Sequence, residues 1–398
     1  MSNDTDMLEN NEIGLKPAWV DEDDSNYTVK PNNYQVIPKW AIIQKQTIEV
    51  ERNEIEELIT QSNFALTKGK SVDSNVLDYR LLSKSNVLRA EITVIKYHRD
   101  GELLLVCGSK GTFAILSSSD EFVKPIHSGE LKNFHIRFAD FVDGRNEIVI
   151  FGEQSYFYIY NMDSRVSEQV KLRSSKFKFN KYAISGDYIA TVDVQGTLSI
   201  VRSDTRSVVH ESILASTQVS AITFSPDGNT LFLSYNGQIH CFSMTDMKLF
   251  HKFKDYGNAN SKSVTSIAIS DVYNLKNSTG TKTTYLCTGS EFGYINSYDL
   301  ANCMTETNPK PLKDFDNLVH PITSIHFHPS SSIMVAFSKL DDNLIRFFQY
   351  PSHHTYIPTN QTKQCKHITA LDFSPLANWF TIGNSNGTIF TFKLPLFK

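Results

Sequence analysis

The chain has 398 residues, a formal net charge of −4 and a hydrophobic content of 40%. This composition suffices for a sizeable hydrophobic core and argues against the strongly basic surface of a nonspecific nucleic-acid binder. No run of about 18 apolar residues occurs, so no membrane span is expected. The N-terminus lacks the apolar centre of a secretory signal. The five cysteines are scattered without C-x-x-C spacing, which predicts free thiols in a reducing compartment.

The first 45 residues are predicted to form a disordered, acidic tail. Residues 1–30 hold eight acidic and two basic side chains, so the remainder of the chain is close to neutral. The stretch KPAWVDEDD places an aromatic and an aliphatic side chain directly before four acids. Apolar anchors in a soluble tail are typical of a docking element; the alternative is an exposed tryptophan without a partner. The candidate partner-binding residues here are Pro17, Trp19, Val20, Asp21 and Glu22.

Residues 46–73 are predicted to form a short helix and a linker. In QTIEVERNEIEELITQ, residues 46–61, the apolar side chains Ile48, Ile55, Leu58 and Ile59 fall near one stripe and acids occupy the other side. This pattern indicates an amphipathic helix, but nothing in the sequence identifies its partner.

From about residue 92 the hydrophobic period changes to alternation, and one pattern of strands and turns recurs. Stretches such as QVSAITFSPDGNTLFLSYNGQIHCFSM contain apolar strands separated by Ser-Pro, Asp-Gly or Asn-Gly turns. Successive copies are separated by 41, 46, 40, 45, 58 and 46 residues, counted at the end of the first strand of each copy. A period in the low forties predicts an all-β fold, a seven-bladed β-propeller spanning residues 74–398. The positions used for this count are Tyr97, Phe138, Ile184, Phe224, Ile269, Phe327 and Phe373.

A propeller needs a partner for the exposed edge of its last blade. The final copy offers three strands before the chain ends, whereas SNVLDYRLLS, residues 74–83, shows apolar alternation ahead of the first copy. We therefore expect residues 74–83 to close the last blade. The alternative is a disordered linker.

No motif for catalysis, cofactor binding or metal binding stands out. The sequence lacks the G-x-S-x-G, H-E-x-x-H, P-loop and Rossmann patterns. His326 and His328 are placed on one face of a strand but lack a third ligand, and His353-His354 lies in a polar stretch that predicts solvated side chains. We expect no catalytic residue, no metal and no cofactor, and hence no enzyme.

The densest basic run leaves two readings open. It could contact RNA phosphates, or it could be a solvated strand edge guarded by lysines. The run comprises Lys171, Arg173, Lys176, Lys178 and Lys181.

The repeats resemble WD repeats, although the Trp-Asp dipeptide is missing and Tyr298-Asp299 is its nearest match. Residues 287–338, the segment LIRFFQYPSHHTYIPTN at 344–360 and the last copy are similar to the U3 small nucleolar RNA-associated protein 18 family. ETNPKPLKDFDNLV, residues 306–319, is the most distinctive part and is expected to connect the fifth and sixth units. KPAWVDEDD resembles the N-terminal motif of the same family.

This resemblance implies a non-catalytic scaffold of the small-subunit processome in the nucleolus. Its partners would be other WD-repeat and helical-repeat subunits, together with U3 small nucleolar RNA and the ribosomal RNA precursor. Direct RNA contact stays open, and neither a membrane nor a small-molecule substrate is expected. A surface insertion that contacts a partner is expected at Thr307, Asn308, Pro309, Lys310 and Pro311; a plain interblade linker is the alternative.

Two other functions compete with the scaffold. A generic WD-repeat adaptor of a ubiquitin ligase or chromatin complex would capture peptides on one propeller face. An enzyme would need ionisable side chains converging in the central channel, and the sequence suggests no such cluster.

Overall fold

The computed structural model describes residues 76–77, 79–119, 122–172, 177–257, 264–274, 281–316, 318–329, 332–340, 342, 344–376 and 378–394. All of them belong to one compact unit. No helix within these residues has the length and apolar character needed to cross a membrane. The predicted tail at 1–45 and the predicted helix at 46–61 lie outside the described residues.

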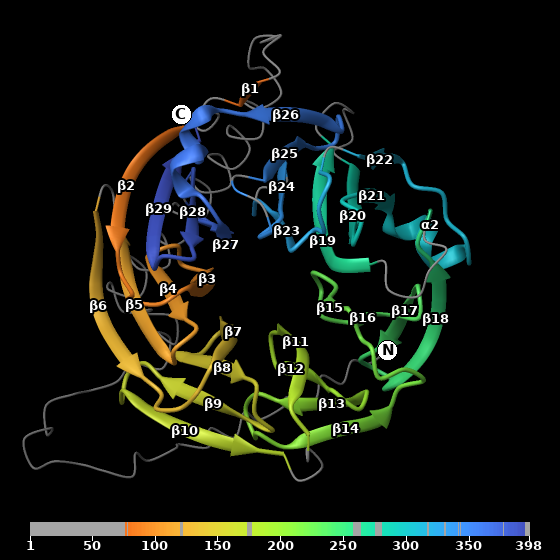
Figure 1. Ribbon diagram of the computed structural model, residues 1–398. Coiled ribbons are helices and arrows are strands. Elements are labelled where there is room, and N and C mark those ends of the chain that lie inside the picture. Colours follow the sequence, from red (N-terminus) through yellow and green to blue (C-terminus); the bar gives the residue numbers. More distant parts are fainter. Residues whose placement is uncertain are drawn as a thin grey trace, which may run out of the picture. The chain divides into compact units, whose positions relative to one another are not determined.

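Seven sheets are arranged around a central axis, which confirms the predicted β-propeller (Figure 1). The first four sheets are built from β3 (Ile92–Tyr97), β4 (Leu103–Gly108), β5 (Thr112–Ser119), β6 (Phe122–Glu130), β7 (Ile136–Phe141), β8 (Glu147–Gly152), β9 (Tyr156–Asn161), β10 (Val166–Lys171), β11 (Phe179–Ser185), β12 (Tyr188–Asp193), β13 (Thr197–Arg202), β14 (Val208–Ile213), β15 (Ala221–Phe224), β16 (Thr230–Tyr235), β17 (Gln238–Ser243) and β18 (Lys248–Lys254).

The remaining three sheets include two, the sixth and the seventh, that also contain a strand from before the first repeat. They are built from β19 (Val264–Asn274), β20 (Thr281–Ser290), β21 (Ile295–Asp299), β22 (Lys313–Phe315), β23 (Ser324–Phe327), β24 (Ile333–Phe337), β25 (Ile345–Gln349), β26 (His354–Pro358), β27 (Ile368–Phe373), β28 (Trp379–Asn384), β29 (Thr388–Lys393), β1 (Val76–Leu77) and β2 (Arg80–Asn86). Two short helices, α2 (Leu300–Thr305) and the 3₁₀ helix η2 (Asn360–Cys365), lie between strands.

Local sequence explains the antiparallel hairpins that make up each blade. Between β16 and β17, Asn236 and Gly237 have φ angles of +54° and +70°. Both residue types tolerate this left-handed region, which the tight turn of a two-residue hairpin requires. Side chains alternate along the flanking strands, so each strand buries apolar groups against both neighbouring blades.

Ring closure differs in detail from the expected strand at 74–83. β2 pairs antiparallel with β29 and is the outermost strand of the seventh sheet. Val76 and Leu77 instead form β1, which pairs parallel with β26 of the sixth sheet. The segment 74–83 therefore contacts two blades. Between β1 and β2 the chain passes from the rim of the sixth blade to the rim of the seventh.

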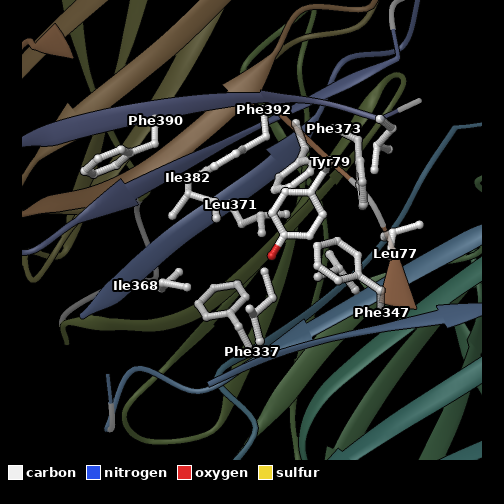
Figure 2. Close-up of a cluster of buried hydrophobic side chains, with 14 of the residues drawn as sticks. Leu77, Tyr79, Phe337, Phe347, Ile368, Leu371, Phe373, Ile382, Phe390 and Phe392 are labelled. Atoms are coloured by element: carbon white, nitrogen blue, oxygen red, sulfur yellow. The ribbon is translucent and has the colours of Figure 1, made fainter. Parts of the chain in front are cut away.

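Tyr79 occupies the crossing point between these two strands. It is fully buried, and its ring centroid lies 5.5–5.6 Å from the ring centroids of Phe347, Phe380 and Phe392. Figure 2 shows Tyr79 among apolar side chains of the sixth and seventh blades, with Leu77 beside it. Its hydroxyl group lies 3.2 Å from Thr362 Oγ1, so the one polar atom of the ring is hydrogen-bonded.

Three of the positions used to count repeats do not end a strand: Ile184 is the penultimate residue of β11, and two others lie further inside their strands. Phe138 lies in the middle of β7, which continues to Phe141, and Ile269 lies within β19, which continues to Asn274. The second unit is therefore shifted by three residues relative to the alignment expected from the sequence. The fifth unit begins with an extended hairpin of 11- and 10-residue strands. This hairpin contributes to the 58-residue spacing between the fifth and sixth units.

Candidate functional site

The innermost strand of every blade lines a central channel. Side chains and backbone from β3, β7, β11, β15, β19, β23 and β27 surround a cavity of about 510 Å³. In Figure 1 these strands face the middle of the ring. The cavity falls within the roughly 300–1,000 Å³ range of ligand-binding clefts.

Four ionisable side chains occupy one register in four neighbouring blades. Lys96, Asp140, His326 and Asp372 are each the penultimate residue of their innermost strand. Because the seventh blade adjoins the first, closure of the ring brings them side by side. Around the ring, basic and acidic side chains alternate in the order His326, Asp372, Lys96, Asp140. They lie at the end of the channel where the innermost strands finish.

The contacts within this group are direct. Lys96 Nζ lies 3.4 Å from Asp140 Oδ2, and His326 Nδ1 lies 3.8 Å from Asp372 Oδ1. The Tyr97 backbone N–H donates to Asp372 Oδ2 at 2.8 Å, and Ser324 Oγ lies 2.8 Å from His326 Nε2. Each of the four side chains at this end of the channel therefore has a polar or charged neighbour within about 4 Å.

Burial and neighbouring charge set the protonation of these groups. The Asp140 carboxylate raises the pKa of Lys96, although desolvation opposes it. Desolvation raises the pKa of Asp372 to about 6 against the opposing charge of Lys96, and it lowers the pKa of His326 to about 3. At neutral pH, His326 is therefore neutral, Lys96 is charged, and Lys96 has two carboxylates to interact with.

This cluster corrects the expectation that no ionisable groups converge in the channel. The sequence contained a signal, because the four residues share one strand position. The three-residue shift of the second unit hides this signal. When Phe138 is aligned with Tyr97, Asp140 does not fall at the position of Lys96. Nothing local to any one strand indicates that the four side chains meet.

The predicted basic run is dispersed by the fold. Lys171 ends β10 at the rim, whereas Lys181 lies in β11 and lines the channel. Lys178 is exposed in the segment that leads into β11. Arg173 and Lys176 lie outside the described residues. The run is therefore not one strand edge, and its members contact different parts of the propeller.

The segment at 306–311 belongs to the fifth unit and is not a link between units. β22 pairs with β21, so this segment connects two strands of one blade. The Thr307 carbonyl accepts a 2.9 Å hydrogen bond from the Lys254 N–H, and His251 Nε2 lies 2.9 Å from the Cys303 carbonyl. The connection is thus held against β18 of the preceding blade.

The five predicted contact residues of this segment differ in accessibility. Thr307, Asn308 and Lys310 are exposed, Pro311 is partly buried, and Pro309 is buried. Pro309 therefore packs inward as an anchor of the connection. A partner could reach the polar side chains at 307, 308 and 310.

The histidine pairs form no site with a third ligand. His326 contacts Ser324 and Asp372, whereas the ring of the buried His328 packs edge-on against Phe373 at 5.1 Å. Within the residues that the structure describes, no group of three His, Cys, Asp or Glu side chains could hold a metal ion. His353 is half-buried against Tyr350 rather than solvated, because the turn folds back onto the fifth blade.

A buried carboxylate, Asp255, is the centre of a hydrogen-bond network in the fifth blade. Asp255 Oδ1 accepts hydrogen bonds from Thr288 Oγ1 at 2.7 Å, Asn296 Nδ2 at 3.1 Å and Tyr298 Oη at 2.6 Å. The Tyr298 hydroxyl in turn accepts from the Tyr256 N–H at 2.8 Å. Tyr298 therefore connects the blade to the segment that precedes it, and its neighbour Asp299 caps α2 by accepting from the Ala301 N–H.

Exposed apolar side chains mark the rim of the third and fourth blades. The outermost strands β14 and β18 carry Val208, Val209, Ile213, Leu249 and Phe250, and Ile213 is 84% exposed. Outer strands also present unpaired backbone groups to solvent. This part of the rim is suited to contact with another protein.

The tail residues Pro17, Trp19, Val20, Asp21 and Glu22 lie outside the described residues, so their expected role stays a prediction.

No family model matches the sequence. The chain is, however, 25% identical over 372 residues to human "U3 small nucleolar RNA-associated protein 18 homolog", covering 90% of this chain and 64% of that protein. It is 24% identical to the Caenorhabditis elegans homolog, covering 95% and 96%, and 22% identical to the Schizosaccharomyces pombe "Probable U3 small nucleolar RNA-associated protein 18", covering 95% and 70%. The chain thus spans somewhat less than two thirds of its human relative. Similarity of this extent to animal and yeast proteins supports the resemblance to the U3 small nucleolar RNA-associated protein 18 family that the sequence motifs carry.

Proposed function

We propose that the chain is a non-catalytic scaffold subunit of the small-subunit processome in the nucleolus. It would support U3-guided processing of the small-subunit ribosomal RNA precursor and so take part in ribosome biogenesis. The observation that carries this proposal is the similarity, along 90% of the chain, to a relative named as U3 small nucleolar RNA-associated. A rigid ring with a rim, two faces and several loops suits a protein that contacts many partners.

The rim of the third and fourth blades supports a scaffold role. Its exposed aliphatic and aromatic side chains lie on two neighbouring outer strands, β14 and β18. Burying such side chains against a partner contributes about 25 cal/mol per Å² of apolar surface. We assign this surface to contact with another WD-repeat or helical-repeat subunit.

Two further docking elements belong to the proposal. The tail residues Pro17, Trp19, Val20, Asp21 and Glu22 would insert apolar side chains into a partner while the acids steer it towards a basic surface. In the fifth blade, Thr307, Asn308 and Lys310 would contact a neighbour, with Pro309 and Pro311 holding the backbone. The exposed positions of 307, 308 and 310 support this assignment.

The channel chemistry favours a scaffold over an enzyme. Lys96 forms an ion pair with Asp140, Asp372 accepts from the Tyr97 N–H, and His326 is hydrogen-bonded to Ser324. A catalytic nucleophile or base needs a group that is free to meet a substrate, whereas these side chains hold neighbouring blades together.

Affinity purification of the tagged, full-length chain at moderate salt tests the proposal, with proteins and RNAs identified together. We expect U3 RNA, ribosomal RNA precursor and other large WD-repeat proteins in the eluate. Ligase or chromatin subunits without these RNAs would support the generic adaptor instead and contradict the processome role.

Matched variants separate the rim from general surface effects. Ile213→Ser combined with Leu249→Ser should remove one or more protein partners from the eluate. The control Leu376→Ser changes an apolar residue that is 75% exposed, between the values of Ile213 and Leu249, in the connection between β27 and β28. The Trp19→Ala variant tests the tail separately and should lose a different partner if the two elements dock independently.

A further inference from the structure

The two ends of the central channel differ in charge compensation. Where the innermost strands finish, Lys96 is paired with Asp140, and Asp372 is a second carboxylate that interacts with it. Where these strands begin, the cavity is lined by Lys181, which has no acidic partner among the described residues. The fold therefore leaves one cation of the channel uncompensated.

Two further cations surround Lys181 at this opening. Arg137 is the second residue of β7 in the preceding blade, and Lys339 follows β24, where its N–H donates to Thr323 Oγ1 just before β23. Arg137 and Lys181 thus lie near the beginning of innermost strands, and Lys339 lies beside the beginning of β23, so all three are on the same face of the propeller. Arg137 is paired with Glu153, and Lys339 is exposed, so two positive charges stay available.

The walls beside Lys181 strengthen attraction for an anion. Phe138 and Tyr182 line the cavity, and their rings pack with centroids 4.8 Å apart. An apolar wall lowers the local dielectric constant and makes a charge-assisted hydrogen bond stronger than in water. Burial, with the positive charges of Lys339 and Arg137, lowers the pKa of Lys181, and a bound anion would relieve this cost.

We propose that this end of the channel is an anion-binding site for a phosphate group, with Lys181 as its central donor and Lys339 at its entrance. A phosphate offers several acceptor oxygens and more than one negative charge, which suits two cations approaching from different blades. The phosphate can come from a free small molecule or from the backbone of a single-stranded nucleic acid. The inference stands on the channel geometry and does not depend on the proposed function.

Thermal unfolding of the full chain in phosphate-free buffer tests the site, with inorganic pyrophosphate as the probe. Pyrophosphate should raise the melting temperature of the wild type and leave the Lys181→Met variant unchanged. In the absence of pyrophosphate, the Lys181→Met variant should melt above the wild type, because it removes a desolvated cation that has no partner. The control Lys248→Met removes the same charge from the exposed rim strand β18 and should behave as the wild type does.

Titration of the variants measures the affinity itself. Lys181→Met should weaken pyrophosphate binding by about tenfold or more, since a hydrogen bond between charged groups is lost. Lys339→Met changes an exposed side chain and so keeps the fold; it should weaken binding severalfold even if Lys181→Met fails to fold. Lys181→Arg keeps the charge and should retain most of the affinity.

A fluorescent single-stranded RNA dodecamer distinguishes the two phosphate sources. Binding of both probes, weakened together by the lysine variants, would identify strand phosphates as a ligand. Binding of pyrophosphate alone would indicate a small free phosphate compound. Equal stabilisation of the wild type and both lysine variants by pyrophosphate, or none at all, would overturn the proposal while leaving the processome role untouched.

Discussion

Lys96 and Asp140 lie on the innermost strands of adjacent blades, and Lys96 Nζ approaches Asp140 Oδ2 to 3.4 Å. The two side chains are 30% and 27% exposed, so water screens their attraction only in part. Asp372 of the last blade adds a second negative charge that raises the pKa of Lys96. One lysine in the first blade thereby interacts with the blades on both sides of it.

Removing one partner of this pair should destabilise the propeller. Asp140→Asn keeps the side-chain shape but leaves Lys96 with Asp372 alone, and we expect a loss of about 1–3 kcal/mol in the free energy of unfolding. Urea denaturation measures it, and a double-mutant cycle with Lys96→Met isolates the coupling. Asp143→Asn, which changes a carboxylate on the same cavity wall, is the control; an equal loss there would show that the pair is not the cause.

Asp255 should be the most sensitive polar residue of the fifth blade. It is only 3% exposed, and one of its oxygens accepts three hydrogen bonds. Asp255→Ala would leave three buried donors without that acceptor, and we expect the free energy of unfolding to fall by about 3–5 kcal/mol.

The matched variant is Tyr298→Phe, which removes one donor of this network and the acceptor of the Tyr256 N–H. Its expected cost is about 1–2 kcal/mol. Melting temperatures of both variants give the comparison. Similar values for the two variants would mean that Asp255 does not organise the network.

The repeat number could be predicted because each hairpin is specified locally. The alternation of apolar residues and the turn at Asn236-Gly237 identify strands without knowledge of the rest of the chain. Strand ends were less certain, as Phe138 and Ile269 illustrate, because an aromatic or aliphatic residue fits the middle of a buried strand as well as its end.

The pairing across the ring could not be predicted from local pattern. Lys96 meets Asp372 only because β2 pairs with β29 and closes the circle, which joins residues about 275 positions apart in the chain. For the same reason the division of 74–83 between two blades was missed. Alternation marks Leu77, Tyr79 and Leu81 as one strand, whereas the sheet edges that receive them belong to different blades.

Buried histidines should make the propeller sensitive to mild acid. Desolvation lowers the pKa of His328 to about 4 and that of His326 to about 3. A depressed folded-state pKa means that the stability is complete above the unfolded value of about 6.5 and is lost as the pH falls towards 4. Asp372, whose pKa is raised to about 6, acts in the opposite direction and favours the folded state at low pH.

The His328→Gln variant tests this dependence. At pH 5 the wild type should lose about 2 kcal/mol through His328 relative to pH 7, and the variant should lose that much less. Urea midpoints at the two pH values give the difference, with His367→Gln at an exposed ion pair as the control. If the variant and the wild type show the same pH dependence, protonation of His328 is not coupled to unfolding.

Tyr79 should determine whether the ring stays closed. Its side chain is fully buried between the sixth and seventh blades, where it contacts three phenylalanine rings (Figure 2). Tyr79→Ala removes the aromatic ring at the crossing between β1 and β2, and we expect the free energy of unfolding to fall by about 3–5 kcal/mol. Tyr79→Phe keeps the ring, loses only the hydrogen bonding of the hydroxyl to Thr359 and Thr362, and should cost about 1 kcal/mol. Hydrogen exchange locates the effect: in Tyr79→Ala the amides of β2 and β29 should exchange faster, while those of β15 to β18 keep wild-type protection relative to global unfolding. Uniform acceleration across all blades would instead mean that the ring opens only when the whole propeller unfolds, and that the crossing at Tyr79 is no weaker than any other interface between blades.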